Sequence, residues 1–122
     1  MEIRELVLKC AGFADDKKAE NITILDMREV SSITDYFVIA SGNSDPQVRA
    51  IADEIERGMR EECETKVHLM EKASHAWIVL DYFDFIVHVM RRDVRDKFDL
   101  EGLWGDAKRI KFEPEQNPSV SS

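Results

Sequence analysis

The sequence predicts an α/β fold in which a single mixed sheet of about five strands is flanked by helices. Amphipathic segments with a helical period occur near the start, in the middle and near the end of the chain. Short apolar runs of strand length lie between them, in the order helix, two strands, helix, three strands, helix. A length of 122 residues fits one domain.

The N-terminal third predicts one helix and two strands. Residues 2–15 form the helix, because their apolar positions recur every three or four residues. These positions are Ile3, Leu6, Val7, Cys10 and Ala14. Strands are expected over residues 20–27 and over residues 35–42, and the second of them ends at Gly42.

The middle of the chain predicts a second helix and three strands. Asp45 is expected to cap the helix and Pro46 to occupy its first position, where a missing N–H has no cost. The apolar stripe of this helix consists of Val48, Ile51, Ala52, Ile55 and Met59. An edge strand is expected over residues 64–72, followed by strands at 77–82 and 85–90 that form a hairpin.

The C-terminal part predicts a mainly helical segment over residues 92–104. From Glu113 onward the chain is rich in proline, serine and polar residues and offers nothing to bury. We therefore expect a folded domain over residues 1–112 and a disordered tail over residues 113–122.

The charge and composition of the chain argue against some classes of binding partner and favour others. A net charge of −8 argues against a nucleic-acid backbone, because such binding rests on lysines and arginines that neutralise phosphates. Acids outnumber bases over residues 45–64, which favours a basic protein surface as partner. The two cysteines form no C-x-x-C motif, and no apolar run reaches the roughly 20 residues that span a membrane. We expect a cytoplasmic protein.

The sequence predicts neither a metal nor a cofactor. The three histidines and two cysteines lack the spacing of zinc ligands. His68 and His75 are expected at the surface, whereas His88 is expected to pack or hydrogen-bond within its strand.

One enzymatic alternative is a protein similar to nucleotidyltransferases that acts on a nucleotide. The segment SGNSD lies between a strand and a helix N-terminus, where backbone N–H groups can hold an anion, although one glycine is also what a plain turn requires. That chemistry usually takes two aspartates one residue apart on a strand, which hold Mg²⁺. Asp81 and Asp84 are three residues apart and would point to opposite faces of a regular strand. Their spacing weakens the alternative.

The segment HAWIVLDYFDF, residues 75–85, combines a strand pattern with a tryptophan and two carboxylates. Alternation places Trp77 and Asp81 on one face of the strand and Leu80 on the other. This pattern fits two interpretations. Either Trp77 is a structural residue covered by a helix, or it is an aromatic anchor beside a charge, a combination enriched in protein interfaces.

Three separated motifs resemble the ribosomal silencing factor (Iojap) family. They are a segment running from DDKKAENITILDM to SGNSDPQVRAIADEI, then AWIVLDYFDFIVHVM, and finally FDLEGLWGDA. The resemblance covers about residues 3–107. It implies a nucleotidyltransferase-like α/β fold without the catalytic acids, and therefore no enzyme activity.

The resemblance also implies a function. Members bind the large ribosomal subunit through its protein fourteen, block joining of the small subunit and lower translation when nutrients are scarce. It implies no membrane partner and no sequence-specific nucleic acid, and it leaves a homodimer open. The family's contact motif falls on Trp77, Leu80, Asp81, Tyr82 and Asp84. The family commonly has glycine at the position of Phe83, and a phenylalanine is not expected to adopt the positive φ that glycine allows.

Overall fold

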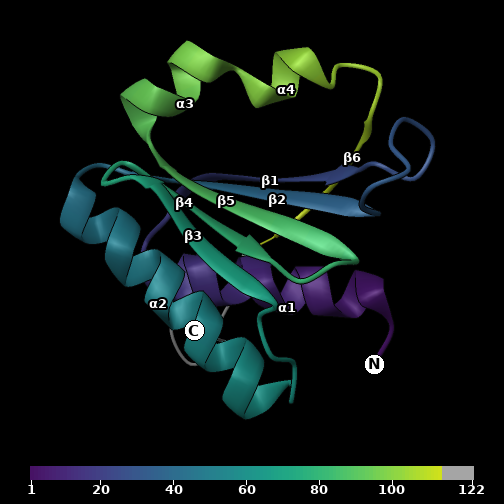
Figure 1. Cartoon of the computed structure of the whole chain (residues 1–122), viewed down its shortest axis with the longest axis horizontal. Coiled ribbons are helices and arrows are strands. Elements are labelled where there is room, and N and C mark those ends of the chain that lie inside the picture. Colours follow the sequence, from purple (N-terminus) through teal and green to yellow (C-terminus); the bar gives the residue numbers. More distant parts are fainter. Residues whose placement is uncertain (114–122) are drawn as a thin grey trace, which may run out of the picture.

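A computed structural model describes residues 1–113, which form one sheet between two layers of helices (Figure 1). The strands are β1 (Glu20–Asp26), β2 (Tyr36–Gly42), β3 (Leu69–Ser74), β4 (Trp77–Asp81), β5 (Phe85–Arg91) and β6 (Lys108–Ile110). The helices are α1 (Ile3–Asp16), α2 (Asp45–Glu62), α3 (Arg92–Phe98) and α4 (Leu100–Leu103). Helices α1 and α2 lie on one face of the sheet, and α3 and α4 lie on the other.

The six-stranded sheet has the order β3-β4-β5-β2-β1-β6. Its central pair, β2 and β5, is parallel, and all the other pairs are antiparallel. The predicted mixed α/β sheet is confirmed. The sixth strand was not predicted, because β6 is three residues long and begins with two charged residues.

The inner layer, between the sheet and α1 with α2, holds the larger core. Its buried residues come from the apolar faces of both helices, which include most of the predicted stripes, and from the strands that they cover. Phe13 of α1 packs on Gly58 of α2, where an added Cβ would lie 2.6 Å from the phenyl ring. A glycine at this position therefore lets the two helices approach closely.

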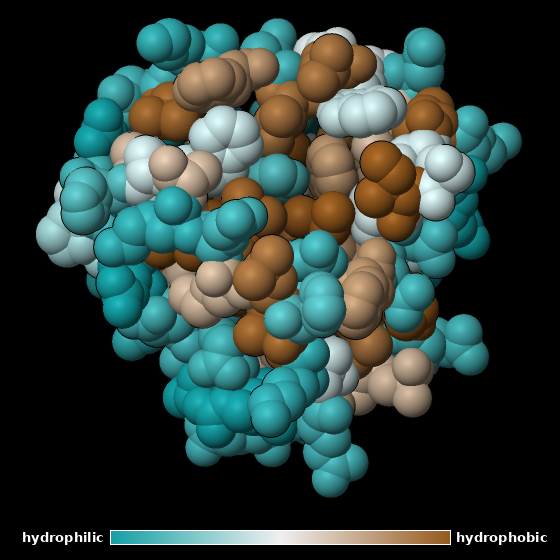
Figure 2. Space-filling view, viewed as in Figure 1, coloured by the Kyte–Doolittle hydropathy of each residue, from teal (hydrophilic) through white to brown (hydrophobic). Residues whose placement is uncertain are grey.

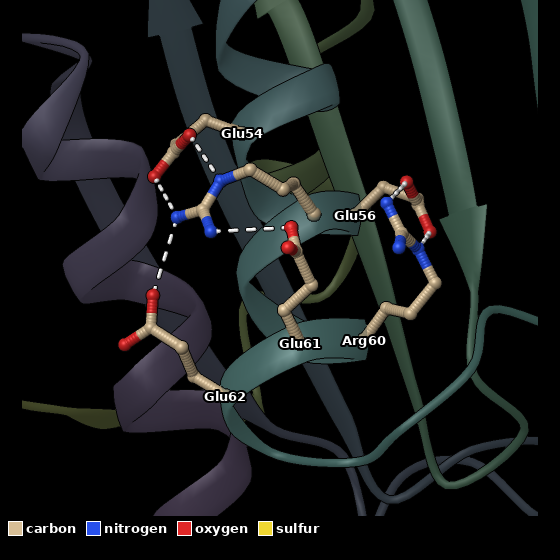
Figure 3. Close-up of polar contacts among 6 residues, drawn as sticks. Glu54, Glu56, Arg60, Glu61 and Glu62 are labelled. Atoms are coloured by element: carbon tan, nitrogen blue, oxygen red, sulfur yellow. Dashed lines mark hydrogen bonds and ion pairs between the residues drawn. The ribbon is translucent and has the colours of Figure 1, made fainter.

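Acids on the outer side of α2 are largely paired with arginines of the same helix (Figure 3). Arg57 contacts Glu54 at 2.7 Å, Glu62 at 3.2 Å and Glu61 at 3.4 Å. Such pairs on an exposed helix surface add modest stability. Three arginines thus pair with five of the seven acids of residues 45–64, and a net charge of −4 remains on this segment.

The outer layer holds a smaller core of Leu25, Met27, Ile39 and Met90. Residues of α3 and α4 and of the segment after them cover it, namely Val94, Leu100, Trp104 and Ala107. Arg95 of α3 is also buried there, with 6% of its surface exposed. Its guanidinium bonds Glu101 at 3.0 and 2.9 Å, which ties α3 to α4.

The same guanidinium ties α3 to the sheet. It donates to the carbonyl of Asn21 at 2.6 Å, to Ser41 Oγ at 2.8 Å and to Thr23 Oγ1 at 3.0 Å. Every N–H of the Arg95 side chain therefore has an acceptor, which is the condition under which a buried charge is tolerated.

Two local expectations need correction. Ser44, and not Asp45, caps α2, since its Oγ accepts from the N–H of Gln47 at 3.3 Å, and Pro46 is therefore the second helical residue rather than the first. The edge strand begins at Leu69 rather than at residue 64, and all six of its residues are exposed.

The segment 92–104 is mainly helical, as predicted. It is interrupted at Asp99, which adopts a left-handed conformation (φ 44°) and caps α4 by accepting from Gly102 N–H.

The predicted disordered tail lies outside the described residues, apart from Glu113. The boundary between residues 112 and 113 therefore stays a prediction. No helix of residues 1–113 is both long and apolar enough to span a membrane.

We expect Arg95→Met to lower the free energy of unfolding by about 3–5 kcal/mol, because it leaves Glu101 and the sheet acceptors without their buried partner. Urea denaturation measures this loss. Arg92→Met is the matched control, since the Arg92 side chain is 60% exposed and makes only a surface hydrogen bond to Asn43 at 3.3 Å and an ion pair with Glu20 at 3.9 Å. The control should change stability by less than about 0.5 kcal/mol. Equal effects of the two substitutions would contradict the role given to Arg95.

Candidate docking surface

The β4–β5 hairpin presents different residues to the two layers. Register places Asp81 between Leu69 of β3 and Ile86 of β5, and it places Val79 between Glu71 and His88. Cross-strand neighbours share a face. This outer face is the one on which α3 lies, because Trp77 contacts Phe98 of that helix.

We define the docking surface as Leu69, Glu71, Trp77, Val79, Asp81, Ile86 and Phe98. Leu69 and Phe98 are 48% and 52% exposed, and Trp77, Val79, Asp81 and Ile86 are half-buried. Figure 2 shows hydrophobic residues gathered between α3–α4, at the top of the view, and the strands below them. The surface is thus apolar with two carboxylates.

Trp77 is held from two sides. Its indole N–H donates to Nδ1 of His88 at 3.1 Å, and its ring tilts against that of Phe98 with centroids 5.1 Å apart. The two interpretations of Trp77 are therefore partly combined, because α3 covers part of the ring while the rest faces outward. A tryptophan held in this way is suited to be an interface anchor.

His88 is buried beneath the surface, where it packs as the sequence predicts but accepts its hydrogen bond from Trp77 of the neighbouring strand rather than from its own. Burial lowers its pKa to about 4, so the imidazole is neutral near pH 7. Its Nδ1 accepts a hydrogen bond from the indole N–H, so the single N–H of the neutral imidazole is at Nε2. Nε2 has no hydrogen-bond partner among the described residues.

The turn of the hairpin is built around Phe83. Its φ is 69°, so the expectation that phenylalanine would not adopt a positive φ here is wrong. The N–H of Phe83 donates to Oδ1 of Asp81 at 2.8 Å, and its carbonyl accepts from Thr34 Oγ1 at 3.2 Å. Its ring stacks on His68 with a centroid distance of 3.9 Å. These contacts offset the strain of a left-handed non-glycine residue.

The five residues of the family's contact motif fall into two groups in the structure, one at the surface and one in the inner core. Trp77 and Asp81 lie on the docking surface, and Asp84 is exposed in the turn at its end. Leu80 and Tyr82 are buried in the inner core, with 0% and 6% of their surfaces exposed. Three of the five can touch a partner directly, and the other two support the hairpin from below.

Alternation along the strand places Val79 on the face of Trp77 and Asp81, and the structure confirms this. Sequence reasoning missed Leu69, Ile86 and Phe98 as surface neighbours of Trp77. Alternation was a signal for the first two, since it sorts outward from inward residues. Phe98 carried no such signal, because its place over Trp77 depends on how α3 packs.

The two features on which the nucleotidyltransferase alternative rests, the SGNSD turn and the carboxylate of Asp81, lie far apart in the structure. Asn43 N–H donates to the side chain of Gln47, so the SGNSD turn uses this donor internally. Gly42 pairs with Arg91 at one end of β5, whereas Asp81 pairs with Ile86 near the other. The turn and the carboxylate are therefore roughly 17 Å apart along the strand. Within residues 1–113, no group of three or more metal-ligating side chains comes together.

Fold and surface define a small α/β protein that presents an apolar and acidic face of its sheet. The whole chain, residues 1–122, matches the family described as Ribosomal silencing factor during starvation, and the protein belongs to this family. It is 48% identical over 103 residues to ribosomal silencing factor RsfS of Bacillus subtilis, covering 83% of this chain and 86% of the relative. The corresponding protein of Halalkalibacterium halodurans is 38% identical and covers 93% and 97% of the two chains.

A solved structure shows the same fold. The crystal structure of protein CV0518 from Chromobacterium violaceum superposes with a TM-score of 0.82 at 30% sequence identity. The superposition covers 98% of this chain and 99% of that one. The resemblance inferred from three motifs is thereby confirmed.

The low pKa of His88 makes stability depend on pH. The folded protein holds this proton less tightly than the unfolded chain, where the pKa is 6.5. The contribution of neutral His88 to the free energy of unfolding is therefore complete above pH 6.5 and is lost as the pH falls towards about 4. We expect the wild type to lose about 3 kcal/mol more than His88→Leu between pH 7 and pH 4, measured by urea denaturation. If the two proteins lost the same free energy of unfolding between pH 7 and pH 4, His88 would not be the cause of the pH dependence.

Proposed function

We propose that the protein binds the large ribosomal subunit through large-subunit ribosomal protein fourteen. Bound there, it occupies the face to which the small subunit docks, keeps the subunits apart and represses translation when nutrients are limiting. It acts in the cytoplasm and catalyses no reaction. Family membership supports the ribosome as partner, and the docking surface is the observation that carries the proposal.

The chemistry of the docking surface suits a basic ribosomal protein. Aromatic residues surrounded by apolar contacts are typical centres of binding energy in interfaces. Trp77 and Phe98 supply such a centre, and Glu71 and Asp81 add negative charge beside it. Complementary charge orients the encounter and speeds association.

Within this proposal the five motif residues have two roles. Trp77, Asp81 and Asp84 contact the partner. Leu80 and Tyr82 act indirectly, because they anchor the hairpin in the inner core, where the Tyr82 ring stacks on Phe85 with a centroid distance of 4.7 Å. Replacing either residue would alter the surface only by moving the strand above it.

Sedimentation with separated ribosomal subunits tests the function. The protein should pellet with the large subunit and not with the small one, and it should prevent added small subunits from forming joined particles. Purified protein fourteen should compete for binding. Pelleting with neither subunit, or unhindered joining, would overturn the proposal.

We expect Trp77→Ala and Asp81→Lys each to abolish detectable binding. Truncating an interface tryptophan typically costs about 2–4 kcal/mol, or roughly 30- to 1000-fold in affinity. Asp81→Lys adds repulsion, so its effect should appear in the association rate and grow at low salt. Sedimentation and association kinetics measure both variants.

Two controls separate binding from folding. Asp81→Asn keeps an oxygen for the N–H of Phe83 but removes the charge, so its turn stays intact while binding weakens. Asp53→Lys reverses an exposed charge on α2, which lies beyond the opposite face of the sheet, and should bind like the wild type. If Trp77→Ala melts far below the wild type, or if both docking-surface variants still block joining, the surface is wrongly assigned.

We expect no nucleotide binding. The SGNSD turn and the carboxylate of Asp81 lie at opposite ends of the sheet, so they cannot hold one Mg²⁺–nucleotide complex. Calorimetry with ATP, CTP or UTP and Mg²⁺ should give no heat of binding at micromolar concentrations. Saturable heat would favour the enzymatic alternative.

A further inference from the structure

We propose that His88 is a positioning residue of the docking surface, which accepts the indole N–H of Trp77 and fixes the direction in which that ring faces a partner. The inference rests on the proposed function and adds to it a residue outside the family's contact motif.

The bond joins diagonal neighbours on two strands. Val79 lies directly opposite His88, and Trp77 lies opposite Met90, two residues further along β5. Side chains in this diagonal relation are within reach when both are large. The ring centroids of Trp77 and His88 are 5.8 Å apart, and the indole nitrogen lies 3.1 Å from Nδ1.

Apolar packing holds the indole on its other sides. Trp77 packs against the smaller, outer core and contacts Phe98, which is itself 52% exposed at the end of α3. His88 is fixed, since it is buried and its ring meets that of Phe37 edge-on with centroids 4.9 Å apart. Apolar contacts do not set the direction of the indole N–H, whereas the hydrogen bond to His88 does.

Stability alone gives no reason for an imidazole at this position. The Nε2 atom is buried without a partner among the described residues, which is unfavourable for a polar group. An apolar side chain of similar size would fill the same space without that penalty. What the imidazole provides, and an apolar side chain does not, is an acceptor directed at Trp77. Holding an anchor in its bound orientation raises affinity, because less freedom is lost on binding.

A double-mutant cycle tests the coupling. His88→Leu removes the acceptor, Trp77→Phe removes the donor, and the double variant removes both. We expect His88→Leu to weaken binding to the large subunit about 3- to 10-fold, the worth of one hydrogen bond. In the Trp77→Phe background the same change should have no further effect. His88→Asn, whose amide oxygen takes the place of Nδ1, should restore most of the affinity.

A second readout needs no ribosome. The chain has two tryptophans, so an NMR spectrum shows two indole N–H signals, and Trp104 serves as the internal reference. In His88→Leu the Trp77 signal should shift and exchange faster with solvent, while the Trp104 signal stays in place. His88→Asn should return the Trp77 signal towards its wild-type position.

The outcomes separate the two proposals. If the wild type does not bind the large subunit, the proposed function fails, and the indole signals alone decide whether His88 positions Trp77. The positioning role is overturned if His88→Leu weakens binding equally in both backgrounds. An unchanged Trp77 signal in that variant, or no recovery in His88→Asn, would overturn it as well.

Discussion

The guanidinium of Arg95 joins parts of the chain that are far apart in sequence. It bonds Glu101 beside it, the carbonyl of Asn21 and the hydroxyls of Ser41 and Thr23. Because α3 has seven residues and α4 has four, neither helix has a long apolar stripe with which to hold itself on the sheet. The buried and fully hydrogen-bonded guanidinium of Arg95 therefore fixes how α3 and α4 lie on the sheet, because their own hydrophobic contacts are few. The outer layer depends on it.

That placement determines the shape of the docking surface. With α3 fixed, Phe98 lies over Trp77, and the aromatic contacts continue through His88 and Phe37 to Trp104. The inner layer holds the same hairpin from the other side through Leu80 and Tyr82. The hairpin is thus held from below by the inner core, while its other face is only partly covered.

Periodicity predicted most of the fold, because α1, α2 and the central strands each bury one continuous apolar face. It failed where no such face exists, as in β6, and where adjacent residues can both cap a helix, as Ser44 and Asp45 can. For the site, alternation correctly placed Trp77 with Asp81. Phe98 could not be derived as a neighbour of Trp77, since it reaches the tryptophan only through the packing of α3. The positive φ of Phe83 likewise depends on tertiary contacts that hold it.

The order of the elements along the chain has a consequence for the order of folding. The β4–β5 hairpin is local and can form as soon as its residues are available, whereas the bonds from Arg95 to Asn21 and Thr23 span 74 and 72 residues. During synthesis the strands of the sheet, apart from β6, precede the helices that cover their outer face. The aromatic surface is therefore completed only after α3 and the segment that follows it have been synthesised.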